Sequence, residues 1–287
     1  MKAIYKRELK AYFTGVSGYV FIAFLLLMVG IYAAVINFNY AQPNFESVLG
    51  NVGLVFLLIV PILTMRTFAE ERRQKTDQLL YALPVGMSEI VFGKYLAMLT
   101  VLLIPTVVIC IYPLVLSFYG TIDLLTCFSS IFAFFLMGGA LLAVGMFISS
   151  TTDNQIVAAV ISFAVLLLLY LMTQLASFLP TSAAGSLMAF AILILLIGII
   201  IYLMTRHGVV ASLVVILLMA ALYSVYLLEP TLLEGAFQTA ALQLSVFDRL
   251  YTFIDGIFDL SGVVYYLSFA GLFVFFTIQS LEKRRWS

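Results

Sequence analysis

The largest group of charged side chains between apolar runs lies at residues 66–94, which read RTFAEERRQKTDQLLYALPVGMSEIVFGK. The whole 287-residue chain is 64% hydrophobic and 10% charged, so this segment stands between long apolar runs. Mixed acidic and basic side chains outside a bilayer can form ion pairs with the surface of a soluble protein. We therefore look for function first in this charged segment.

The charged segment predicts a solvated helix over 66–82, because it holds strong helix formers and oppositely charged side chains four residues apart. The two pairs are Glu71–Lys75 and Arg73–Asp77. Pro84 ends this helix, and Ser88 with Glu89 caps the helix that follows. The segment thus predicts a short lever of two helices and a turn between two membrane crossings.

Several kinds of catalytic chemistry are not expected in this chain. A P-loop needs G-x-x-x-x-G-K-[ST], but Gly93-Lys94 is followed by Tyr95, and Ser88 stands where the first glycine belongs. Two cysteines and one histidine do not suggest a metal site. We expect no catalytic residue, no metal and no cofactor in the chain, and no enzyme activity of its own.

The apolar remainder predicts an all-α polytopic membrane protein. The mean hydropathy is +1.17, and apolar runs long enough to cross about 30 Å of hydrocarbon recur along the chain. None of the expected crossings has an ionisable residue at its centre, which disfavours an ion-coupled carrier. We expect eight crossings, at about 18–36, 50–66, 91–117, 126–148, 156–177, 187–205, 209–228 and 262–280.

Charges divide unequally between the two sides that these crossings define. Thirteen basic and seven acidic residues fall on the side of the termini, against one basic residue, Arg249, and seven acidic residues on the other. Basic loops stay in the cytoplasm during insertion. We therefore expect both termini in the cytoplasm.

Three further features organise the chain, which we expect to be a single membrane domain over 1–287. Residues 1–16 predict an interfacial helix whose apolar side chains share one face. These are Tyr5, Leu9, Tyr12 and Phe13. The fourth crossing is rich in small residues that let another helix approach closely. Residues 229–261 predict short amphipathic helices on the opposite side of the membrane.

Three segments together resemble the permease of ABC-2-type transporters. They are IYKRELKAYFTGVSGYVF at 4–21, RTFAEERRQKTDQLLYALPVGMSEIVFGKY at 66–95 and ISSTTDNQIVAA at 148–159. The end of the chain, FDRLYTFIDGIFDLSGVVYYLSF at 247–269 and LEKRRW at 281–286, resembles the gliding-motility-type branch. The likeness covers roughly the first 180 and the last 40 residues.

The resemblance implies a permease subunit that dimerises with a second copy or a paralogue and docks on a separate cytoplasmic P-loop ATPase. ATP and Mg²⁺ would bind to that partner, and the chain would form the translocation pathway, in the direction of export. Residues 1–16 would be the elbow helix and 66–90 the coupling region. The residues implied to face the ATPase are Phe68, Glu70, Glu71, Arg72, Pro84, Ser150, Thr151, Asp153 and Gln155.

The resemblance also implies a helical bundle like that of type V exporters. Members commonly have six crossings, so eight would add a hairpin near 187–228 to the six-helix core. Two other functions remain open from the residues: an ATP-independent carrier or channel, and a membrane scaffold whose segment 229–261 binds a partner outside the cytoplasm. Binding of nucleic acid is not expected.

Overall fold

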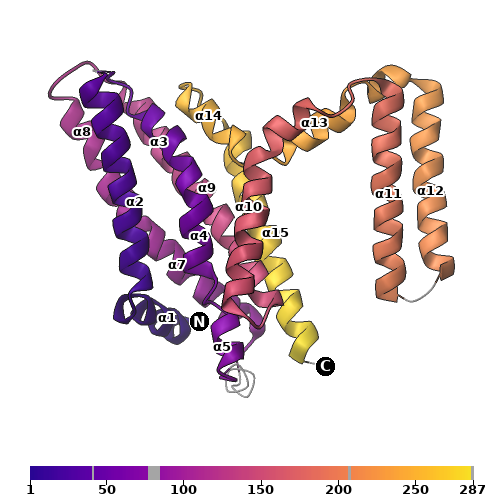
Figure 1. Ribbon diagram of the computed structural model, residues 1–287, viewed down its shortest axis with the longest axis horizontal. Coiled ribbons are helices and arrows are strands. Elements are labelled where there is room, and N and C mark those ends of the chain that lie inside the picture. The colour runs from indigo at the N-terminus through magenta and orange to yellow at the C-terminus, as the bar shows by residue number, and fades with distance from the viewer. Residues whose placement is uncertain (41, 77–84, 206–207, 286–287) are drawn as a thin grey trace. The chain divides into compact units, whose positions relative to one another are not determined.

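The computed structural model describes the chain except for residues 41, 77–84, 206–207 and 286–287 (Figure 1). Every regular element among the described residues is helical, which confirms the all-α class. The described chain forms two compact units, one of residues 1–170 with 246–287 and the other of residues 171–245.

The first unit contains the long helices around which the rest of the unit packs. Their bounds, with those of the shorter elements between them, are α1 Lys2–Thr14, α2 Ser17–Ala33, η1 Ala34–Asn39, α3 Glu46–Val52, η2 Gly53–Val55, α4 Phe56–Thr64, α5 Ala69–Arg73, α7 Met87–Ile109, α8 Ile111–Leu116, α9 Leu124–Thr151, α14 Asp248–Ile254 and α15 Leu260–Arg285. Helix α10, Gln155–Ser177, begins in this unit. Helices α1 and α5 lie at the same end of the unit as the end of α15 (Figure 1).

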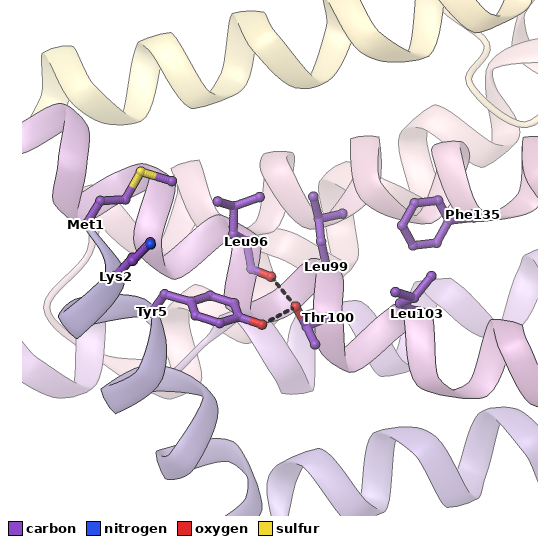
Figure 2. Close-up of a pocket in the computed structure, with 8 residues that line it drawn as sticks. All are labelled: Met1, Lys2, Tyr5, Leu96, Leu99, Thr100, Leu103 and Phe135. Carbon is purple, nitrogen blue, oxygen red and sulfur yellow. Dashed lines mark hydrogen bonds between the residues drawn. The ribbon is translucent and has the colours of Figure 1, made fainter.

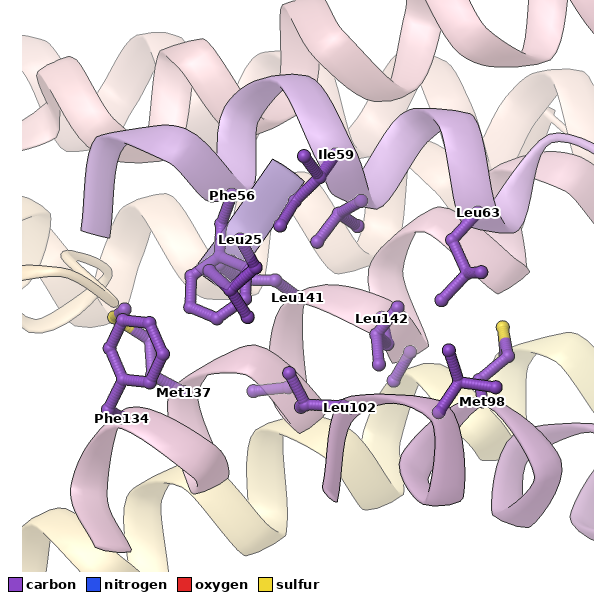
Figure 3. Close-up of a cluster of buried hydrophobic side chains, with 14 of the residues drawn as sticks. Leu25, Phe56, Ile59, Leu63, Met98, Leu102, Phe134, Met137, Leu141 and Leu142 are labelled. Atoms are coloured by element: carbon purple, nitrogen blue, oxygen red, sulfur yellow. The ribbon is translucent and has the colours of Figure 1, made fainter. Parts of the chain in front are cut away.

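Helix α9 is the central helix of the first unit, since it packs against α4, α7, α14 and α15. Side chains of α2, α4, α7 and α9 interlock in its core (Figure 3). Lipid tails are as apolar as these side chains, so close packing rather than transfer from water stabilises such contacts. The labelled core residues are Leu25, Phe56, Ile59, Leu63, Met98, Leu102, Phe134, Met137, Leu141 and Leu142.

Glycines let α4 and α7 approach α9 closely. A Cβ atom at Gly138 would lie 2.8 Å from Leu102 and 2.9 Å from Phe56, and one at Gly145 would overlap Thr64. A side chain at Gly138 would have to displace the tips of Leu102 and Phe56, and one at Gly145 would meet the short Thr64 side chain, which has little room to move. The expectation that small residues of the fourth crossing serve helix packing is therefore confirmed.

The third expected crossing is broken near its end. Helix α7 ends at Ile109 and α8 resumes at Ile111. Pro113 lacks the N–H that would bond to the carbonyl of Ile109, and its ring crowds that carbonyl. Pro105 lies within α7, which continues past it for another turn. Of the two prolines, Pro113 thus explains the break.

The second unit holds a pair of apolar helices followed by short helical turns. Helix α11 spans Ala183–Thr205 and packs against α12, Gly208–Leu228, and both contact η3, Pro230–Leu233. Helix α13, Ala236–Gln243, begins after Gly235, whose positive φ of 68° suits a residue without a side chain. The amide of Gly235 donates a 2.8 Å hydrogen bond to the carbonyl of Thr181.

Six helices among the described residues are long and apolar enough to span a membrane. A seventh is added if α12 and the following turns, which bend by 119°, count as one span. The sequence predicted eight, and the two additional crossings at 187–205 and 209–228 correspond to α11 and α12. The described apolar part of α11, Ala183–Ile199, is shorter than the other spans.

The charged segment folds differently from the sequence prediction. Its helix α5 covers only Ala69–Arg73, and the backbone leaves the helical region at Lys75, where φ is +56°. Gly86, rather than Ser88 or Glu89, is the N-cap of α7, and no side chain caps that helix end. The predicted continuation to residue 82 and the role of Pro84 lie outside the described residues.

Candidate coupling site

A buried lysine of α7 connects this helix to α5 within the charged segment. Lys94, in the second turn of α7, has a side chain only 1% exposed. Its ammonium nitrogen lies 2.9 Å from Oε1 of Glu71 and 3.2 Å from Oε1 of Glu8. It also donates a 2.8 Å hydrogen bond to the carbonyl of Thr67 and lies 5.0 Å from the centre of the Phe68 ring. Lys94 therefore contacts α1, α5 and the two residues just before α5.

Arg7 completes a group of four charges with Lys94 and the two glutamates. Its Nη2 atom lies 2.6 Å from Oε1 of Glu8 and 2.9 Å from Oε1 of Glu71. Burial alone would lower the pKa of Arg7, but the hydrogen bond and charge of Glu8, with those of Glu71, raise it. Two cations thus face two carboxylates, and the group balances its own charge. We call Arg7, Glu8, Glu71 and Lys94 the charge cluster.

The charge cluster holds three helices in one arrangement. Glu8 belongs to α1, Glu71 to α5 and Lys94 to α7. Withdrawing charges from water is costly, and the mutual attraction offsets this cost only when the geometry is good and hydrogen bonds are complete. A shift of α5 that separated Glu71 from Lys94 would leave buried charge uncompensated. Movement of α5 is therefore tied to movement of α1 and α7.

The other side of α5 is tied to the loop between α9 and α10. Arg72 is 9% exposed, and its Nη1 donates a 3.3 Å hydrogen bond to the carbonyl of Thr152 and lies 3.6 Å from Oδ1 of Asp153. Arg284 at the end of α15 donates to the same Oδ1 at 2.9 Å and to the carbonyl of Thr151 at 2.7 Å. Hydrogen bonding and the charge of Arg284, with that of Arg72, lower the pKa of the Asp153 carboxyl.

Ser149 fixes the start of α5 against α9. Its hydroxyl oxygen accepts hydrogen bonds of 3.2 Å from the backbone N–H groups of Phe68 and Ala69. The first N–H groups of a helix have no partner within the helix, so a side chain of another helix satisfies them here. The same hydroxyl lies 3.3 Å from the carbonyl of Met65, to which it donates.

The predicted coupling residues fall into an inward-facing and an outward-facing group. Phe68, Arg72 and Ser150 are buried, and the Glu71 side chain is 19% exposed and turned toward Lys94. The outward-facing group holds Glu70, Thr151, Asp153 and the half-buried Gln155. The Glu70 side chain is 35% exposed and lies 3.8 Å from Arg66, and that of Asp153 is 73% exposed. Pro84 lies outside the described residues.

The apolar residues of α1 face the protein. Tyr12 is 6% exposed, and Tyr5, Leu9 and Phe13 pack against the hydrophobic core. Burial, together with the charges of Glu8 and Glu71, raises the pKa of the Tyr12 hydroxyl. These side chains therefore hold α1 beside the charge cluster, where Glu8 and Arg7 reach Lys94 and Glu71.

Sequence reasoning missed Lys94 and Glu8 as site residues. The sequence places Lys94 among the basic residues on the cytoplasmic side of the membrane. A lysine there is ordinarily expected to be exposed to solvent. Its one local signal is its place between the apolar residues Val91, Phe92, Tyr95 and Leu96, inside a membrane crossing, where charged residues are rare.

A family model described as ABC-2 family transporter protein matches residues 18–207. This match covers more than half of the chain. The chain belongs to the ABC-2 transporter family. Membership of this family makes the chain a multi-pass membrane protein and the permease component of an ABC transporter. No curated protein matches the chain.

The ABC-2 match includes the centre of the candidate site but not its edges. Glu71, Arg72, Lys94 and Asp153 lie within residues 18–207. Their partners Arg7 and Glu8 in α1, and Arg284 in α15, lie outside. In this ABC-2 protein, the elements before and after the matched region thus supply some of the charges that hold α5 and the loop after α9 in place.

Proposed function

We propose that the chain is an ABC exporter permease whose helix α5 and the loop at 151–153 receive the movement of a separate cytoplasmic ATPase. The observation that supports this most is the attachment of α5 on both sides. Glu71 connects it to α1 and α7 through the charge cluster, and Arg72 connects it to the loop after α9. A push on α5 would therefore reach at least four helices.

The exposed acidic groups are the best candidates for contact with the ATPase. Glu70 and Asp153 expose 35% and 73% of their side chains. Because Glu71 is turned inward onto Lys94, we assign it to transmission within the permease and Glu70 to docking. Opposite charges at a protein interface guide association and set its register. The docking surface of the ATPase should accordingly carry basic side chains.

In the proposed mechanism, ATP and Mg²⁺ bind to the partner ATPase, and its closure around nucleotide moves α5. The chain has no P-loop sequence, so this energy source is external. Helix α5 is too short to bend, and it is held at its start by Ser149 and at its middle residue, Glu71, by the charge cluster. It would therefore move as a rigid piece with the ends of α7 and α9.

The assembly follows from the same proposal. Two permease copies, or this chain and a paralogue, would stand in a bacterial inner membrane with α1, α5 and the end of α15 in the cytoplasm. The family match supports the permease role, and the excess of basic residues on the side of the termini supports this orientation. The likeness of 247–269 and 281–286 to the gliding-motility-type branch supports that placement within the family.

Affinity purification of the full chain from native membranes tests the proposal. We expect an ATPase with a P-loop to copurify in a fixed ratio. Liposomes that contain the chain alone should show no flux driven by an ion gradient. A chain that is transport-competent by itself and free of any ATPase would contradict the proposal and support a carrier or channel.

A further inference from the structure

An apolar cavity with a lysine at its edge lies between α1 and the helices α7 and α9. Its volume is about 330 Å³ (Figure 2). Figure 2 shows Met1 with Lys2 and Tyr5 of α1 facing Leu96, Leu99, Thr100 and Leu103 of α7, with Phe135 of α9 at one end. A volume of this size is within the range of small-molecule sites in proteins.

The few polar groups of the cavity leave one charge without a partner. The Tyr5 and Thr100 hydroxyls lie 3.0 Å apart, and Thr100 donates a 2.8 Å hydrogen bond to the carbonyl of Leu96. Lys2 is exposed and has no ion pair or hydrogen bond with the residues that the structure describes. The terminal ammonium group of Met1, another lining residue, is already paired with Oε2 of Glu89 at 2.7 Å. The cavity therefore offers mainly apolar walls and, at its edge, the Lys2 ammonium group, which has no partner among the described residues.

A second apolar cavity continues the first along α7 and α9. Its volume is about 520 Å³, and both cavities are lined by Leu99 and Phe135. The second is also lined by residues of α15 from Tyr266 to Ile278. Helices α7, α9 and α15 are each apolar enough to span a membrane, so both cavities are lined by candidate membrane-spanning helices.

From this arrangement we propose that the cavity binds an anionic phospholipid. The phosphate lies at Lys2, and one acyl chain lies against Leu99 and Leu103 toward Phe135. The occupant must be both apolar and anionic, because the walls are leucine and phenylalanine and the unpaired group at the edge is a cation. Basic pockets between membrane helices bind acidic lipid head groups in this way. The lipid would brace α1, which carries Arg7 and Glu8 of the charge cluster.

Native mass spectrometry of the full chain in mild detergent tests this proposal. The protein is titrated with phosphatidylglycerol and, separately, with phosphatidylcholine of the same chain length. We expect tighter binding of phosphatidylglycerol, and we expect Lys2→Glu to weaken it about five-fold or more, as follows from roughly 1 kcal/mol per basic residue near a lipid surface. Lys10→Glu is the matched control, since Lys10 is exposed on the same helix but does not line the cavity.

The variant Leu103→Trp tests the chain-binding part separately. Leu103 is 45% exposed and lines the cavity, so tryptophan can fill the space without entering the core. We expect weaker binding of both lipids in this variant, with an unchanged elution volume on size exclusion. The proposal would be overturned if the two lipids bound with equal affinity, or if Lys2→Glu and Lys10→Glu weakened phosphatidylglycerol binding equally. It would also be overturned if Leu103→Trp changed the number of protein copies in the complex instead of weakening lipid binding. None of these results depends on whether an ATPase copurifies.

Discussion

The ammonium group of Lys94 lies 2.9 Å from a carboxylate oxygen of Glu71, with 1% of the lysine side chain exposed. This pair joins the start of α7 to α5. Glu8 and Arg7 of α1 belong to the same charge cluster, so α1 is joined to these two helices as well. The position of α5, which we propose to contact the ATPase, is thus set by a buried interaction and not by local helix propensity.

Replacement of Lys94 by methionine should destabilise the protein by about 3 kcal/mol, because among the described residues it leaves Arg7 as the one cation paired with both glutamates. Thermal unfolding in detergent measures the effect. Lys6→Met, an exposed change on α1, should shift stability by less than about 0.5 kcal/mol.

The double variant Lys94→Met/Glu71→Gln then tests the pair itself. It should lose clearly less than the sum of the two single losses, since the partners interact. Strict additivity would show that Lys94 and Glu71 contribute independently.

Replacement of Ser149 by alanine should cost about 1–3 kcal/mol, because the buried N–H groups of Phe68 and Ala69 lose their acceptor. Hydrogen exchange should rise at the start of α5 before it rises elsewhere. Ser268→Ala serves as the control, since that exposed hydroxyl donates only to carbonyls of its own helix. Equal effects of the two changes would contradict the role of Ser149.

A methyl group at Gly145 should destabilise the contact between α4 and α9. The Cβ atom of Gly145→Ala would overlap the Thr64 side chain, and such overpacking costs about 1–3 kcal/mol. Gly271→Ala in α15 is the control, because no atom lies within 4 Å of its added Cβ. That control should be neutral or slightly stabilising, as expected for glycine within a helix. Thermal melting of both variants measures the difference.

Attachment of the 151–153 loop should weaken in acid. The pKa of Asp153 is lowered in the folded protein by Arg284 and Arg72, so its contribution is complete above the ordinary aspartate pKa of about 4 and disappears as the pH falls through the lowered value. The effect should be small, because the side chain is 73% exposed. Melting temperatures measured from pH 7 to pH 3 should fall less in Asp153→Asn than in the unmodified protein.

Much of the helical architecture could be predicted from apolar length, and the glycines of α9 could be predicted to serve packing. The charge cluster could not, because Glu8, Glu71 and Lys94 are far apart in the sequence and meet only in the fold. The i,i+4 rule paired Glu71 with Lys75, but Glu71 binds two cations from other helices, and the helix ends before Lys75. Tertiary pairing thus replaced the local pairing that the sequence suggested.

The proposed function requires that Glu70 of α5, the helix beside the loop after α9, contacts a separate ATPase. Copurification of that ATPase with Glu70→Lys, compared with Glu234→Lys, tests it most directly, since Glu234 is exposed in the segment that we place on the opposite side of the membrane. We predict loss of the ATPase from Glu70→Lys, with normal membrane insertion and melting temperature, and full retention by Glu234→Lys. Full retention of the ATPase by a correctly folded Glu70→Lys protein would contradict the account.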